Sequence, residues 1–210
     1  LSQWDMFDQN ASSPFFDPEW MFDVKDGFDI VIANPPYVFT RDVDFGNNFK
    51  KYIEKEYFSK VKIPGKKTKA NQSGKINLYS VFIMKGILLC SKAGILNYIV
   101  PNNILRTTTY DIVRKFILDN TCINQIVDLG SGVFDSVTAS TIIMQIANTI
   151  NISNNLCSIT DIKNLQQQQF NISNISQDQF KNNISYSFNI YGDNKSQSII
   201  SKIEKSNYRL

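Results

Sequence analysis

The stretch "FDIVIANPPYV", residues 28–38, joins an apolar run to a rigid polar corner. Residues 28–33 do not alternate strictly between polar and apolar side chains, a pattern typical of a strand buried on both faces of a parallel sheet. Two successive prolines then end the strand, because proline has no backbone N–H to donate to a neighbouring strand. We therefore expect a fully buried strand over 28–33, with Asn34, Pro35, Pro36 and Tyr37 at its carboxyl end.

The segments that follow alternate between helical and strand patterns. Strands that alternate with helices predict a parallel α/β sheet. The last two expected strands are joined without a helix, so one of them should run antiparallel. We expect helices over 76–94, stopping at Ala93–Gly94, and over 107–121, opening on threonine caps, and strands over 95–101, 123–130 and 140–148.

The remaining segments are less regular. Residues 1–27 are aromatic and acidic and are expected to be irregular, and residues 38–75 read as an extended loop with a short helix near 48–58. Asn, Gln and Ser dominate after residue 148, but recurring Ile, Phe and Leu favour edge strands and short helices over a free tail. The glutamine tract 166–169 is expected to be a solvated surface stretch.

Composition limits the possible chemistry. The chain has 210 residues, a net charge of +3 and no histidine, which excludes histidine triads, histidine metal sites and histidine bases. Its three cysteines, Cys90, Cys122 and Cys157, lie scattered in apolar stretches, so we expect buried free thiols in a reducing compartment. The sequence shows neither a signal peptide nor an apolar run of membrane length, and we expect a cytoplasmic location with no membrane partner.

Charge is distributed unevenly along the chain. Residues 1–37 hold seven acidic residues and one basic residue, whereas residues 38–75 hold ten basic residues and four acidic ones. A lysine run is usually a solvated face, but a local excess of this size also suits a polyanionic partner.

The corner at 34–37 has the chemistry to hold an amino group. The Asn34 side-chain oxygen and the Pro35 carbonyl are two acceptors, which suits an –NH2 group with two donors, and Tyr37 offers a flat face for stacking. An aromatic amine is a poor nucleophile because its lone pair is delocalised into the ring. Two acceptors that pull on its hydrogens favour a tetrahedral nitrogen, which can then attack an electrophilic methyl group without a prior general base.

These residues resemble a known family. "FDIVIANPPYV" resembles the catalytic motif of amino-methyltransferases that use S-adenosylmethionine. "GKINLYSVFIMKGILLCSKAGILNYIVPNNIL" and "IVDLGSGVFDSVTASTIIMQI" resemble later motifs of N6-adenine-specific DNA methyltransferases of the TaqI-like and Eco57I-like restriction-modification type. "ASSPFFDPEWMF" is typical of the Eco57I-like branch. The resemblance covers roughly residues 11–148, with a weaker echo at 195–210.

The resemblance implies roles for particular residues. Asn34 and the Pro35 carbonyl would hold the adenine amino group, and Tyr37 would stack on a base extruded from double-stranded DNA. Phe134 would contact the same base. Phe82 would pack on the adenine of S-adenosylmethionine, with Pro36 and Asn34 also lining the cofactor side. Apart from the resemblance, Lys66, Lys67 and Lys69 belong to the lysine run near the expected base pocket, and we expect them to contact DNA phosphates.

The sequence also departs from the family pattern. Members of this fold begin with a strand, a Gly-rich turn for the cofactor and an acidic residue for its ribose, but the 33 residues before Asn34 contain a single glycine, Gly27. We therefore expect the later half of a Rossmann-like methyltransferase domain over 1–148, a flank with edge strands over 149–194, and a closing helix or linker to an absent target-recognition domain over 195–210. The missing first half would complete the cofactor site, so this chain alone should bind S-adenosylmethionine weakly or not at all.

Two alternatives remain open from the sequence. A protein-glutamine methyltransferase shares the Asn-Pro-Pro-Tyr corner, because a glutamine amide also presents –NH2. A catalytically silent DNA-binding remnant is the other alternative, since the Gly-rich turn is missing. The basic insertion and the aromatic at Phe134 favour a nucleic-acid substrate over glutamine.

Overall fold

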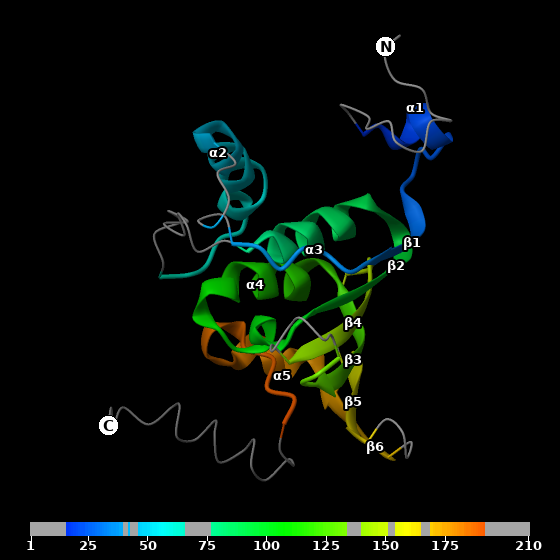
Figure 1. Ribbon diagram of the computed structural model, residues 1–210, viewed down its shortest axis with the longest axis vertical. Coiled ribbons are helices and arrows are strands. Elements are labelled where there is room, and N and C mark those ends of the chain that lie inside the picture. Colours follow the sequence, from blue (N-terminus) through cyan, green and yellow to red (C-terminus); the bar gives the residue numbers. More distant parts are fainter. Residues whose placement is uncertain are drawn as a thin grey trace.

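The computed structural model describes residues 16–39, 42, 46–65, 77–133, 140–150, 154–164 and 169–191 (Figure 1). These residues form an open six-stranded sheet in the order β1-β2-β4-β3-β5-β6. The strands are β1 Phe28–Ala33, β2 Cys90–Pro101, β3 Cys122–Gly130, β4 Thr141–Ala147, β5 Leu156–Asn164 and β6 Gln169–Ser176. The helices are α1 Pro18–Phe22, α2 Gly46–Glu56, α3 Leu78–Leu89, α4 Asp111–Asn120 and α5 Gln177–Asn182, with short 3₁₀ turns at Phe58–Lys60, Asn102–Leu105, Thr108–Tyr110 and Ile184–Tyr186.

The direction of the strands confirms the expected α/β class. β1, β2, β3 and β5 run parallel, while β4 is antiparallel to both of its neighbours, β2 and β3. Among the described residues no helix stands between β3 and β4, and β4 pairs beside β3 in the reverse direction. One register position on β4 shows the arrangement, because Ile142 lies opposite Val100 of β2 on one side and Asp128 of β3 on the other.

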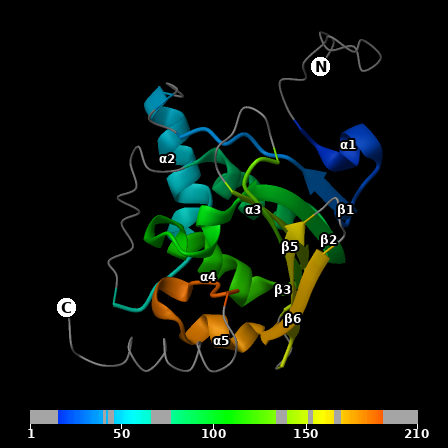
Figure 2. The same cartoon turned by 60° about the horizontal axis from the view of Figure 1, so that its bottom comes forward.

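Three helices cover one face of this sheet. α3, α4 and α5 lie on the same side in two views of the molecule (Figures 1 and 2). Strand side chains that point toward them are buried, among them Leu96, Val100, Ile126, Ile142 and Ile146. The core therefore lies between this helical layer and one face of the sheet.

β1 is not the fully buried strand that the sequence predicts. Val31 and Ala33 pack against the core, but the side chains of Ile30 and Ile32 are 62% and 74% exposed. The prediction assumed that other elements cover both faces of β1 and that strands pair with both of its edges. Among the described residues β1 pairs with β2 alone, and Ile30 and Ile32 point to the face away from α3.

Two helix boundaries also differ from the prediction. α3 ends at Leu89 and the chain is already extended at Cys90, five residues before the predicted strand start, so Ala93–Gly94 lies inside β2. α4 begins at Asp111 after a 3₁₀ turn, and the Thr107 side chain makes no capping hydrogen bond. In both cases contacts with neighbouring strands and loops outweigh the local stop or cap preference.

The less regular segments contain short elements. The expected helix near 48–58 is α2, and the segment expected to be irregular contains the short helix α1, whose first turn is capped by the Asp17 side chain accepting from the Trp20 N–H. After residue 148 the chain forms β5, β6 and α5, and β5 pairs with β3, so the sheet continues past that residue. The proposed division into domains at residue 148 stays a prediction, and residues 195–210 lie outside the described residues.

The three cysteines are free and buried, as the sequence predicts. Burial raises the pKa of the Cys157 thiol to about 12, so it stays protonated at neutral pH. Within the described part of the chain, every helix is too short or too polar to cross a membrane.

Gly27 fixes how β1 joins the sheet, and its replacement is our first prediction. Its φ is +92°, and a Cβ there would lie 2.6 Å from the Ser91 N and 2.8 Å from the Leu89 O, backbone atoms that cannot rotate away. We expect Gly27→Ala to lower the free energy of unfolding by about 2–4 kcal/mol, measured by urea unfolding. Gly65→Ala is the control, because its φ is also positive but an added Cβ meets nothing within 4 Å. Equal effects of the two variants would contradict the steric explanation.

Candidate active site

The Asn-Pro-Pro-Tyr corner lies at the carboxyl end of β1, as the sequence predicts. β1 ends at Ala33, which pairs with Tyr98 of the parallel strand β2. Asn34 and Pro36 are exposed, whereas Pro35 is buried. The Asn34 side chain is therefore outside the core, at the edge of the sheet where open α/β proteins bind ligands.

Tyr37 is held in place by the strand next to it. Its hydroxyl donates a hydrogen bond of 3.1 Å to the Ile99 carbonyl, and its ring meets the Tyr79 ring edge-on at a centroid distance of 6.2 Å. Partial burial raises the pKa of Tyr37, so the phenol is neutral at physiological pH and remains a donor. The ring therefore has a fixed orientation beside Asn34, as a stacking platform requires.

The start of α3 supports the same corner, and this contact was not predicted from the sequence. The Leu78 N–H donates to the Val38 carbonyl at 2.8 Å, and Asn77 caps α3 through its side-chain oxygen. The buried Tyr79 donates from its hydroxyl to the Asn103 side chain at 2.7 Å. An asparagine just before a helical pattern is a recognisable cap signal, but the reach of Tyr79 across to Asn103 has no local signature.

Phe82 lies one helical turn beyond Leu78 on α3. Residues four apart share a face of a helix, so Phe82 lies on the same face of α3 as Leu78. Its side chain is 42% exposed, so Phe82 is not a core aromatic. Its role in packing on the cofactor stays a prediction.

Several predicted site residues lie outside the described residues. These are Phe134 and the basic residues Lys66, Lys67 and Lys69. Their roles stay predictions. Two acidic residues near the ends of strands make structural contacts: Asp29 accepts from the Ser91 hydroxyl at 3.2 Å, and Asp128 accepts from the Tyr191 hydroxyl and from the Gly130 N–H.

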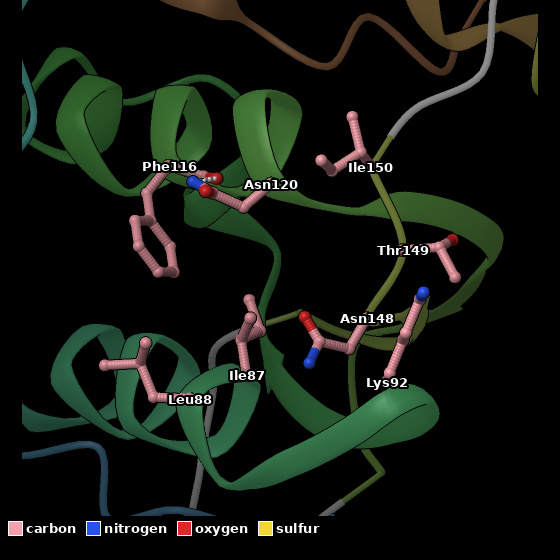
Figure 3. A pocket seen from close by; sticks show the side chains of 8 residues that line it. All are labelled: Ile87, Leu88, Lys92, Phe116, Asn120, Asn148, Thr149 and Ile150. Carbon is pink, nitrogen blue, oxygen red and sulfur yellow. Dashed lines mark hydrogen bonds between the residues drawn. The ribbon is translucent and has the colours of Figure 1, made fainter.

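A groove of about 500 Å³ opens at the other end of the molecule (Figure 3). It lies at the amino end of β2 and the carboxyl ends of α3 and α4, away from Asn34. Its amides are already engaged, since Asn120 donates to the Phe116 carbonyl and Asn148 to the carbonyls of Cys90 and Ser91. With mostly apolar walls and few available polar groups, this groove is a weaker candidate than the corner for a catalytic site. Its lining is Ile87, Leu88, Phe116, Ile150, Lys92, Asn120, Asn148 and Thr149.

An open α/β sheet with an antiparallel strand inserted between parallel ones, and a polar Asn-Pro-Pro-Tyr corner at its carboxyl edge, defines a partial Rossmann-like methyltransferase domain. The family model described as "Eco57I restriction-modification methylase" matches residues 3–134. The chain belongs to this family of restriction-modification methyltransferases.

Curated relatives agree with the family. The chain is 28% identical over 152 residues to the type II methyltransferase M.AccI of Acinetobacter calcoaceticus, covering 69% of this chain and 26% of that protein. It is 29% identical over 126 residues to the type II methyltransferase M.BanIII of Aneurinibacillus aneurinilyticus, covering 60% of this chain and 19% of the relative. The chain thus spans about a quarter or less of the length of these relatives.

Solved structures with a similar fold belong to restriction-modification proteins. The type IIG restriction endonuclease BpuSI superposes with a TM-score of 0.54 at 15% identity, covering 76% of this chain and 20% of that chain. A chain of a type I restriction-modification system superposes with a TM-score of 0.53 at 11% identity, covering 87% of this chain and 43% of that chain. At these identities the likeness concerns the fold alone.

Proposed function

We propose that this chain is the later part of a catalytic domain that transfers a methyl group from S-adenosylmethionine to the N6 amino group of adenine in double-stranded DNA. The observation that carries the proposal is the exposed Asn34 at the carboxyl end of β1, followed by two prolines and by a tyrosine whose ring is fixed. Membership in a restriction-modification methylase family supports DNA as the substrate.

The residues of the corner would act on the amino group of a flipped adenine. The Asn34 side-chain oxygen and the Pro35 carbonyl accept its two N–H groups, while Tyr37 stacks on the ring. This draws the nitrogen lone pair out of conjugation. S-adenosylmethionine would supply an electrophilic methyl group. The corner would hold the amino nitrogen in line with that methyl group, and the proton that the nitrogen gives up after transfer would pass to solvent, so no histidine base is needed.

The cofactor fits the described residues in part. The ring of Phe82, 42% exposed and one turn from Leu78 on α3, can pack on an adenine, and Pro36 of the corner is also exposed. The Gly-rich turn and the acidic ribose ligand of this fold have no match before Asn34. We propose that Asn34, Pro36 and Phe82 hold one side of S-adenosylmethionine and that another segment supplies the rest.

The bare edge of β1 indicates where that segment would dock. The edge of β1 that faces away from β2 has no partner strand among the described residues, and Ile30 and Ile32 are largely exposed on the face of β1 away from α3. Phe16, Phe22 and Phe28, the first residue of β1, form a cluster with ring centroids 6.2–6.5 Å apart. Exposed apolar surface of this kind favours burial against another protein segment. We propose that the first strands of a complete methyltransferase sheet pair with β1.

A second prediction concerns cofactor affinity. We expect isothermal titration calorimetry to show weak or no binding of S-adenosylmethionine to the 210-residue chain, because most contacts expected for the cofactor lie outside it. The full-length protein should bind it measurably. Tight binding by the 210-residue chain would contradict the assignment of the cofactor site to another segment.

The test of the function is methyl transfer by the full-length protein. Duplexes of varied sequence are incubated with labelled S-adenosylmethionine, then digested to nucleosides and analysed by mass spectrometry. N6-methyladenine is the expected product. Label in N4-methylcytosine, or in a protein glutamine, would replace the proposal with a different substrate.

We further propose that Lys66, Lys67 and Lys69 contact DNA phosphates. Charge reversal at Lys66 and Lys67 in the full-length protein should weaken DNA binding and reduce its dependence on salt.

A further inference from the structure

A cluster of three side chains lies at the same edge of the sheet as Asn34, and the motifs do not account for it. The guanidinium of Arg106 lies over the Tyr191 ring, 4.6 Å from its centroid. The Tyr191 hydroxyl donates to an oxygen of Asp128 at 2.5 Å, and the other Asp128 oxygen accepts from the Gly130 N–H at 3.0 Å. We call these three residues the Arg106 cluster.

Hydrogen bonds to the backbone hold the two segments that carry Arg106 and Tyr191. The buried Arg114 donates to the carbonyls of Ile104 and Thr107, on either side of Arg106, and also to the carbonyl of Ser185. The Phe188 N–H donates to the Leu105 carbonyl at 2.8 Å. These bonds join the loop that carries Arg106 to the segment that leads to Tyr191, so the stacked pair is held by two rigid backbones.

The Arg106 guanidinium remains available to a ligand. Arg106 is exposed, and within the described residues the structure gives its side chain no carboxylate partner. Asp128 is 8% exposed and is occupied by Tyr191 and Gly130, so it anchors the ring more than it neutralises the arginine. Burial and the Asp128 carboxylate raise the pKa of Tyr191 to about 12, so its hydroxyl stays a donor at neutral pH.

Position and neighbours favour a phosphate as the ligand. β1 and β3 are three strand spacings apart, so the Arg106 cluster lies roughly 14 Å along the edge from the end of β1. A duplex whose base enters the corner would cover that distance. Exposed Thr107 and Thr108 follow Arg106, and the Thr107 hydroxyl is not used to cap the next turn. A planar guanidinium stacked on an aromatic ring, flanked by hydroxyls, suits the bidentate geometry of a phosphate.

We propose that Arg106, held on Tyr191 and Asp128, is a contact to the DNA backbone that fixes the duplex beside the corner, an inference that rests on the proposed function. The contact carries no sequence information, because phosphates are the same at every base pair. The contact should therefore strengthen the binding of all duplexes by a similar amount.

The experiment measures DNA binding by the full-length protein as a function of salt, using fluorescence anisotropy with a duplex that the wild type methylates and with an unrelated duplex. We expect Arg106→Ala to weaken binding of both and to reduce the slope of log K against log salt by about 1. Arg106→Lys keeps the slope, because the charge remains, and binds more weakly because the stacked planar donor is lost. Tyr191→Leu behaves like Arg106→Lys.

Lys92→Ala is the matched control, since it removes one exposed positive charge at the opposite end of the sheet and should leave the slope unchanged. An Arg106→Ala variant with native circular dichroism and an unchanged slope overturns the proposal. A loss of affinity for only one of the two duplexes would also overturn the proposal, because it would indicate base recognition. If the wild type methylates no adenine, the proposed function fails, and the salt slopes still report separately on the contact.

Discussion

Asn34→Ala in the full-length protein is expected to lower kcat for adenine methylation by about 100- to 1000-fold. Under the proposed function, the substitution removes one of the two acceptors that would draw the amino lone pair out of the ring, an interaction expected to be strongest in the transition state. Because Asn34 is exposed at the end of β1, its loss should leave folding intact. Single-turnover methylation with labelled cofactor measures the effect on the chemical step.

Two companion variants sharpen this test. Asn34→Asp keeps an oxygen acceptor in the same place and should retain more activity than Asn34→Ala. Asn120→Ala removes an exposed asparagine at the far end of α4, where its side chain bonds to the Phe116 carbonyl, and should keep wild-type kcat. A kcat for Asn34→Ala within threefold of wild type would show that the corner does not act on the amino group.

Arg114→Met is expected to lower the free energy of unfolding by about 3–5 kcal/mol, the largest stability effect that we predict. The Arg114 side chain is fully buried and donates to three carbonyls, those of Ile104, Thr107 and Ser185. Methionine fills a similar volume but leaves these carbonyls without their donors. Burial lowers the pKa of Arg114 to about 10, with Asp111 opposing the shift, so the group is charged at neutral pH.

Urea unfolding followed by circular dichroism measures the loss. Lys181→Met on α5 is the control, because this exposed lysine pairs with Asp178 in a surface ion pair of little energetic weight. Arg114→Lys should fall between wild type and Arg114→Met, since one ammonium group cannot reach all three carbonyls. A change below about 1 kcal/mol for Arg114→Met would mean that water or a shifted loop satisfies them.

The fold was predictable to the extent that it depends on local pattern. The apolar run at 28–33 followed by two prolines placed the end of a strand. The lack of a helical pattern in the sequence between the last two expected strands predicted that one of them runs antiparallel, and the structure shows that this strand is β4. Boundaries were less certain: α3 ends at Leu89, where the backbone lies close to Gly27, and a local pattern does not signal a contact with so distant a residue.

The candidate site was predictable only in its central motif. Asn34 to Tyr37 stand out because four specified residues are consecutive, whereas Tyr79 and Asn103 support the corner from positions far along the chain. Arg114 lies in an ordinary amphipathic pattern, and nothing in its neighbours signals that it would be fully buried.

The sequence by itself determined the α/β class, the place of the Asn-Pro-Pro-Tyr corner at the end of a strand, and the kinship with restriction-modification methyltransferases, because each depends on residues close together in the chain. Only the tertiary structure decided that β4 lies between β2 and β3, that Ile30 and Ile32 are exposed, and that Arg106 stacks on Tyr191. These features arise from contacts between segments that are distant in sequence. A local sequence pattern does not specify which distant segment will pack against it.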